Sequence, residues 1–245
     1  MLQKTKAIVL TSIKFGESDL IVKCFTEEGV KSYLLKRILK SKGKKSGLSA
    51  RSVNIAYFQP LTQLKITAIH NNKGSLNSIR EARISYLYQS ISSDIFKQAI
   101  ALFLAETLAH SLHEEEKNPR QFEYIETALN WLDNHDKTSN FHLLFLLNLT
   151  KYLGFYPEMK EKNLQYFDLT EGYFTNNKPF NSYVHGEKLI LFKSLIGINF
   201  DVVEQLELNS KSRKIILDIL LDYYKLHLPG FKRPKSLDVL IEVFS

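Results

Sequence analysis

The residues with the most distinctive chemistry are basic, and they lie in the first third of the chain. Between Glu28 and Glu81 the sequence has 11 basic residues and no acidic one. Lys and Arg side chains can neutralise phosphates and release the counterions condensed on a nucleic acid, and aromatic rings among them can stack on bases. The residues that we expect to form this surface are Lys31, Tyr33, Lys36, Arg37, Lys40, Lys42, Lys44, Lys45, Arg51 and Tyr57. Core filling is the alternative for the two tyrosines, and a solvated face is the alternative for the lysines.

The distribution of charge supports a polyanion as the ligand. Residues 1–80 contain 15 Lys+Arg against 4 Asp+Glu, whereas residues 81–245 contain 18 against 22, and the whole chain has a formal charge of +7. Such an asymmetry indicates an N-terminal part that binds nucleic acid and a C-terminal part with another task. No pattern suggests readout of base edges, so we expect little sequence preference.

Catalytic chemistry has little support in the sequence. The single cysteine, Cys24, lies among apolar residues of a predicted strand and is interpreted as a buried or half-buried thiol. His110 and His113 could offer two imidazoles to a metal, but no third ligand cluster follows, so a solvated helix end is favoured. P-loop, G-x-S-x-G and H-E-x-x-H motifs are absent. We therefore expect no enzymatic activity, no cofactor and no bound metal.

Short β-strands must position the basic residues. Alternating and β-branched segments predict strands over residues 5–13, 20–26, 30–36, 53–58 and 64–70. Five strands are too few for a sandwich and suit a barrel that closes on itself and hides its edges. The first predicted domain is therefore a five-stranded β-barrel spanning residues 1–79.

From about Arg80 the apolar period becomes helical. Ile84, Leu87, Tyr88 and Ile91 share one face of a predicted helix, and Asp94 is a candidate N-cap for the next. Further helices are expected from Pro119 and over residues 141–153, 187–195, 201–206, 211–227 and 237–244. The second predicted domain, residues 80–245, is an all-α bundle interrupted by an irregular segment at 157–186. The fold class expected for the chain is thus multi-domain α+β.

The expected location is the cytoplasm. One cysteine permits no internal disulfide. The longest apolar run, Phe141–Leu149, is far shorter than the roughly 20 residues that span a bilayer, so no membrane association is expected.

Several segments, in order along nearly the whole chain, carry a family likeness. They are Ala7-Ile8-Val9-Leu10, Gly16-Glu17-Ser18-Asp19, Thr26-Glu27-Glu28-Gly29, Leu149–Glu158, Tyr166–Phe174 and the K-S-L of the tail. Together they resemble the RecO family of bacterial recombination mediators and DNA-repair proteins.

The resemblance implies a function and partners. RecO-like proteins have an N-terminal OB-fold and a helical domain, bind single- and double-stranded DNA, and anneal complementary strands. They work with RecR to load RecA onto strands coated by single-strand-binding protein (SSB), which would place this chain at the nucleoid. SSB presents an acidic tail with an apolar end, for which we expect a groove on the Leu102–Leu112 or Leu217–Leu221 face with Arg120 or Lys225.

One departure from the family pattern concerns zinc. Many relatives carry four zinc-binding cysteines in the region that corresponds to Pro157–Gly186, where this chain has none. We predict that aromatic packing replaces the metal. The residues expected to pack are Tyr166, Phe167, Tyr173, Phe174 and Phe180.

Two other functions remain alternatives. The barrel could bind structured RNA in a translation or ribosome-assembly factor, which competition between DNA and RNA oligonucleotides would test. The chain could also be a metal-dependent hydrolase built on His110 and His113, which stoichiometric bound metal would support.

Overall fold

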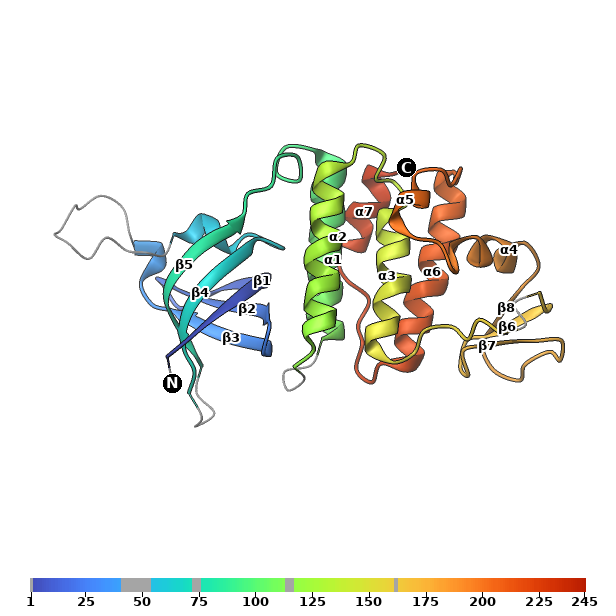
Figure 1. Cartoon of the computed structure of the whole chain (residues 1–245), viewed down its shortest axis with the longest axis horizontal. Coiled ribbons are helices and arrows are strands. Elements are labelled where there is room, and N and C mark those ends of the chain that lie inside the picture. The colour runs from blue at the N-terminus through green and yellow to red at the C-terminus, as the bar shows by residue number, and fades with distance from the viewer. Residues whose placement is uncertain (1, 41–53, 72–75, 113–116, 161–162) are drawn as a thin grey trace. The chain divides into compact units, whose positions relative to one another are not determined.

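A computed structural model of the chain describes residues 2–40, 54–71, 76–112, 117–160 and 163–245. The described residues form two compact units, one comprising 1–93 with 101–129 and the other 94–100 with 130–245. Helices α1 (Ile95–Ser111) and α2 (Pro119–Asn134) each contribute residues to both units. The elements of both units are labelled in Figure 1.

The first unit contains a five-stranded barrel. Its strands are β1 (Leu2–Phe15), β2 (Asp19–Thr26), β3 (Gly29–Leu35), β4 (Gln63–Ile69) and β5 (Ser78–Tyr86), drawn in blue to green in Figure 1. They are antiparallel in the order β3-β2-β1-β4-β5, and a parallel bridge between Tyr33 and Asn77 joins the two outer strands. At this closure the Leu34 N–H donates to the Asn77 carbonyl over 2.8 Å. The order and the parallel closure are those of an OB-fold, which confirms the predicted fold class.

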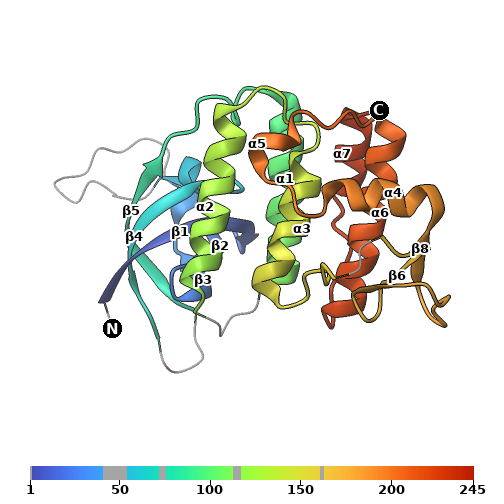
Figure 2. The same ribbon diagram turned by 45° about the vertical axis from the view of Figure 1, so that its right-hand side comes forward.

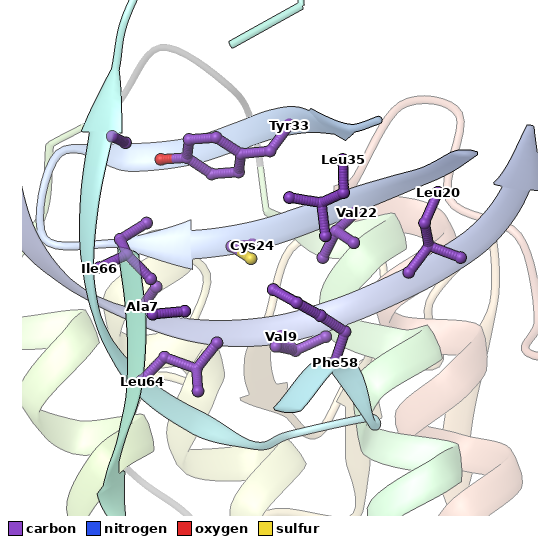
Figure 3. Close-up of a cluster of buried hydrophobic side chains, with 12 residues drawn as sticks. Ala7, Val9, Leu20, Val22, Cys24, Tyr33, Leu35, Phe58, Leu64 and Ile66 are labelled. Atoms are coloured by element: carbon purple, nitrogen blue, oxygen red, sulfur yellow. The ribbon is translucent and has the colours of Figure 1, made fainter. Parts of the chain in front are cut away.

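The barrel interior is a continuous apolar core. Side chains at alternate positions of the strands point inward, among them Val9, Val22, Cys24 and Ile66 (Figure 3). Cys24 is fully buried, as predicted, and this burial raises the pKa of its thiol to about 12. The thiol is therefore a core group rather than a nucleophile.

Helices α1 and α2 cover part of the outside of the same barrel. The Lys23 ammonium donates to the Ala109 carbonyl of α1 over 2.9 Å, and the rings of Phe25 and Phe122 lie 5.5 Å apart. Lys6 of β1 forms an ion pair of 2.8 Å with Glu126 of α2. The middle of β1 and the far end of β2 are consequently buried on both faces.

Two sequence predictions in this region were wrong. Residues 53–58 were predicted to form a strand, but the 3₁₀ helix η2 (Ile55–Phe58) occupies the described part, and Asn54 caps it by accepting from the Ala56 N–H. Residues 84–91 were predicted to be helical, but β5 runs through Tyr86. Of the residues on which that prediction rests, Ile84 lies in β5, and the other three follow the end of the strand. Strand β5 also crosses residue 79, at which the first predicted domain ended.

The second unit is built mainly of helices. They are α3 (Phe141–Leu153), α4 (Gly186–Leu195), α5 (Phe200–Val203), α6 (Ser210–His227) and α7 (Leu237–Val243). Helix α3 is buried from Phe141 to Thr150, as its all-round apolar sequence predicted. It lies alongside α6 (Figure 2), where the Tyr224 hydroxyl donates to the Leu146 carbonyl over 2.8 Å. None of the helices within the described ranges combines the length and the apolar character needed to cross a bilayer.

A small sheet occupies the segment predicted to be irregular. Strands β6 (Tyr166–Asp168), β7 (Tyr173–Thr175) and β8 (Tyr183–His185) pair in the order β7-β6-β8, so the second part of the chain is not purely helical. Phe167 is buried with its ring centroid 4.9 Å from Phe174 and 5.1 Å from Phe192 of α4. The prediction of aromatic packing was wrong for Tyr173 and Phe180, whose side chains are exposed.

Candidate nucleic-acid interface

One end of the outer β1–β2–β3 face is open and carries an exposed aromatic ring. In OB-folds the face of strands 2 and 3 and the adjoining β1–β2 and β4–β5 loops bind oligonucleotides. Helices α1 and α2 cover this face at Lys23 and Phe25, whereas at the opposite end, beside the β1–β2 loop, the described residues leave two large apolar side chains exposed. Ile13 is 62% exposed there and Phe15 is 54% exposed.

Two exposed cations lie beside this ring. Lys36 and Arg37 form the turn that follows β3, and the Arg37 N–H donates to the Asp19 carboxylate over 2.8 Å. The Leu39 N–H donates to the Ser18 carbonyl over 3.0 Å, which is a second tie between this turn and the β1–β2 loop. We call Ile13, Phe15, Lys36 and Arg37 the rim.

The two rim cations lie close to the carboxylate of Asp19. The hydrogen bond from the Arg37 N–H lowers the pKa of the Asp19 carboxyl, and the charges of Lys36 and Arg37 act in the same direction. Asp19 is therefore ionised near neutral pH and holds the turn through its carboxylate. The two basic side chains remain exposed to solvent and can meet a phosphate.

The structure separates the other predicted cations from the rim or leaves them undescribed. Lys31 lies near the other end of β3, close to His70, and its charge adds to burial in lowering the pKa of that imidazole. Lys40 ends the 3₁₀ helix η1 (Ile38–Lys40), and its side chain is not described. The predicted residues outside the described ranges are Lys42, Lys44, Lys45 and Arg51.

The prediction that Tyr33 stacks on bases needs correction. Tyr33 is 0% exposed, and its hydroxyl lies 3.1 Å from Nε2 of His70 (Figure 3 shows the ring in the barrel core). It pairs with Val22 on the inner face of the barrel, where a base cannot reach it. Tyr57 is half-buried and packs against the same core.

Phe15 is the functional candidate that sequence reasoning missed. It is the last residue of β1 and precedes Gly16, whose φ of +60° starts the turn into β2. An aromatic residue at the end of a strand, next to a glycine turn, was the available signal. Because such a residue lies past the covered part of the sheet, its ring can remain in solvent.

A cavity with a volume of about 330 Å³ lies in the helical unit. Lys211, Arg213 and Lys214 of α6 line one side, while Leu217 and Phe244 provide apolar surface. The guanidinium of Arg213 lies 5.8 Å from the centre of the Phe244 ring. Leu217 belongs to one of the two faces predicted for an acidic tail, but Arg120 and Lys225, the predicted cations, do not line this cavity.

Metal-ligating residues are not grouped in the described ranges. No three His, Cys, Asp or Glu side chains lie there in an arrangement that could hold a metal ion, and His113 falls outside these ranges. In the β6–β7 turn the Asp168 carboxylate accepts from the Thr170 and Glu171 N–H groups. Because this segment has no cysteine, it does not fit the zinc site of cysteine-bearing relatives.

Barrel topology and a following helical unit define an OB-fold protein with a helical C-terminal part. The chain matches the family models described as "Recombination protein O N terminal" over residues 1–88 and "Recombination protein O C terminal" over residues 92–238. It is similar to curated proteins named "DNA repair protein RecO" from two species of Flavobacterium. The identity is 49% for that of Flavobacterium psychrophilum and 47% for that of Flavobacterium johnsoniae, with 99% of both chains covered in each case. The RecO of Christiangramia forsetii is 44% identical over the full length of both chains.

The chain therefore belongs to the RecO family. Its role is that of a DNA repair and recombination mediator.

Proposed function

We propose that this chain binds single- and double-stranded DNA without sequence preference, anneals complementary strands, and acts with RecR to load RecA onto SSB-coated strands at the nucleoid. It performs no covalent chemistry and uses no cofactor. The observation that carries the proposal is the rim, where one exposed aromatic ring lies beside two exposed cations at the loop end of an OB barrel. The segment without acidic residues between Glu28 and Glu81 supports a polyanion as the ligand of this part of the chain.

The chemistry of the rim suits a flexible single strand. Lys36 and Arg37 can each neutralise a phosphate, and the release of condensed counterions then drives binding. Phe15 offers a ring face on which any base can stack, with a gain of about 1–3 kcal/mol per base. Neither interaction reads a base edge, so the sequence of the strand matters little.

Annealing requires only that two backbones are brought together while their repulsion is lowered. A basic surface does both, because it neutralises phosphates and raises the local concentration of the second strand. Both effects weaken as salt is added.

We also propose that the cavity lined by α6 and α7 receives the acidic tail of SSB. Its apolar wall, which includes Leu217 and Phe244, suits the apolar end of such a tail. Lys211, Arg213 and Lys214 can meet the preceding carboxylates. This cavity lies in the second unit, whereas the rim lies in the first, so tail and DNA strand have separate sites.

The test of the main proposal is the annealing of complementary oligonucleotides, with and without SSB, over a series of salt concentrations. We expect annealing to accelerate when the protein is added and to slow steeply as salt rises. An RNA oligonucleotide of the same sequence serves as competitor. Preferential binding of RNA, or annealing no faster than without protein, would refute the proposal.

The cavity is tested with a labelled peptide that ends in several acidic residues followed by an apolar one. Lys214→Glu is expected to raise the Kd of this peptide about tenfold or more, because an attraction becomes a repulsion at an exposed position. Lys188→Glu makes the same charge change on an exposed face of α4 and is the matched control. An equal loss of affinity in both variants would exclude the cavity.

A further inference from the structure

Three basic residues lie directly opposite one another on neighbouring strands of the barrel. Lys6 of β1 pairs in register with Lys65 of β4, and Lys65 pairs with Arg83 of β5. Their strand neighbours Ala7, Leu64 and Ala82 face the barrel core. Because side chains alternate between the two faces of a strand, the three cations form one row on the outer face, and we call it the basic row.

The basic row is unfavourable for the isolated barrel. Like charges directly opposite one another on adjacent strands destabilise a sheet. Glu126 compensates Lys6 through an ion pair of 2.8 Å. Lys65 and Arg83 are exposed, and no ion pair joins either of them to an acid within the described ranges. Glu81 is on the same face but pairs with Thr67, which in turn pairs with Lys4 of β1. It is therefore not directly opposite Lys65 or Arg83.

Protection of a sheet edge does not explain the row. Charged residues on edge strands prevent pairing with other chains, and this accounts for Arg83 on β5. Lys65 lies on β4, which pairs with β1 on one side and β5 on the other, so its backbone is not an edge. A polyanion on this face accounts for the two exposed cations, Lys65 and Arg83, because its phosphates offset their repulsion, while Glu126 compensates Lys6.

We propose that the outer face of β1, β4 and β5 is a second phosphate-binding surface, which holds the backbone of a second DNA strand through Lys4, Lys65 and Arg83. The proposal rests on the proposed function and assigns the second of the two strands needed for annealing. Lys6 and Ile13 lie on the same strand, seven positions apart, which corresponds to about 20 Å along the strand. Helices α1 and α2 cover the barrel between these positions at Phe25 and Lys23, so the basic row and the rim are separate surfaces.

The decisive variant is Lys65→Glu, because it should raise the stability of the barrel while it weakens the binding of DNA to the basic row. The new carboxylate stands between Lys6 and Arg83 and relieves their repulsion, so we expect the Tm to rise by about 2 °C. The same change removes a phosphate contact and adds a negative charge, so annealing at 0.15 M salt should slow about tenfold. A residue with a purely structural role would move stability and annealing in the same direction.

Arg83→Gln is the second variant, and Lys188→Glu on α4 is the matched control for charge reversal. All variants are measured as full chains, with the binding of a short single-stranded oligonucleotide as a separate readout. We expect this binding to change less than twofold in Lys65→Glu and Arg83→Gln, because the rim is intact. Annealing at the wild-type rate in Lys65→Glu, or an equal loss in Lys188→Glu, overturns the second surface.

The outcomes separate this inference from the function on which it rests. If the wild-type chain neither binds oligonucleotides nor anneals them, the proposed function fails. If the wild type anneals and Lys65→Glu anneals equally well, only the second surface fails. A duplex competitor that blocks annealing but leaves oligonucleotide binding at the rim intact would support the row as a surface for a backbone rather than for bases.

Discussion

Removal of the two rim cations should weaken DNA binding and make the binding constant less dependent on salt concentration. The variant that we predict to do this is the double substitution Lys36→Gln and Arg37→Asn. Arg37 has a φ of +56°, a conformation that asparagine tolerates better than most residues. Its N–H, which donates to Asp19, belongs to the backbone and is kept. The turn should therefore hold its shape while both charges are lost.

The size of the effect follows from counterion release. Each phosphate neutralised on a single strand contributes about 0.7 to the slope of log K against log salt concentration. Loss of two contacts should therefore lower the magnitude of the slope by about 1.4, which corresponds to an affinity about tenfold weaker at 0.15 M salt than for the wild type. Near 1 M salt the two proteins should bind almost equally.

The assay is fluorescence anisotropy with a labelled oligothymidine over about a tenfold range of salt concentration, from roughly 0.05 to 0.5 M. Lys188→Gln combined with Lys225→Gln removes two exposed positive charges from the helical unit and serves as control. A slope that stays at the wild-type value in the rim variant, or falls equally in the control, would show that net charge rather than the rim governs binding.

Three further predictions concern the rim ring, the small sheet and a buried histidine. Phe15→Ala should cost about 1–3 kcal/mol of binding to single strands with an unchanged salt slope, whereas Leu2→Ala, at the other exposed end of β1, should have no effect in the same titration. Phe167→Ala should lower the free energy of unfolding by about 3–5 kcal/mol in a denaturant titration, and a chelator should leave the wild-type Tm unchanged because aromatic packing holds this sheet. Burial lowers the pKa of His142 to about 3 from an ordinary value of 6.5. Between these pH values the imidazole is therefore protonated in the unfolded chain but neutral in the folded chain. Stability should therefore fall as pH falls through this window, by up to about 1.4 kcal/mol per pH unit, and His142→Leu should flatten the curve.

The sequence predicted most of the elements because their patterns are long or strongly periodic. Strands β1 to β4 alternate over seven or more residues, and α3 is apolar all round, so both kinds of element were found. Strand β5 was missed because its register shift breaks the alternation between Ile79 and Ala82. Three-residue strands such as β6 are too short for any period to appear.

The site was predicted only in part, because a charge pattern identifies cations but not the surface that they share. Lys36 and Arg37 were found and lie together, since both belong to one turn. Tyr33 was assigned to the surface although its alternation with Leu35 places it on the inner face. The basic row could not be found before strand register was known, because Lys6, Lys65 and Arg83 are far apart in the sequence.

The buried thiol of Cys24 can be used to detect opening of the barrel. As the sole cysteine of the chain, with a thiol that is fully buried and has a pKa raised to about 12, it is shielded from alkylating reagents while the strands stay paired. The rate of thiol modification therefore measures how often the barrel opens. Modification in the presence and absence of an oligonucleotide would tell whether a bound strand tightens the barrel or loosens it, without any added label.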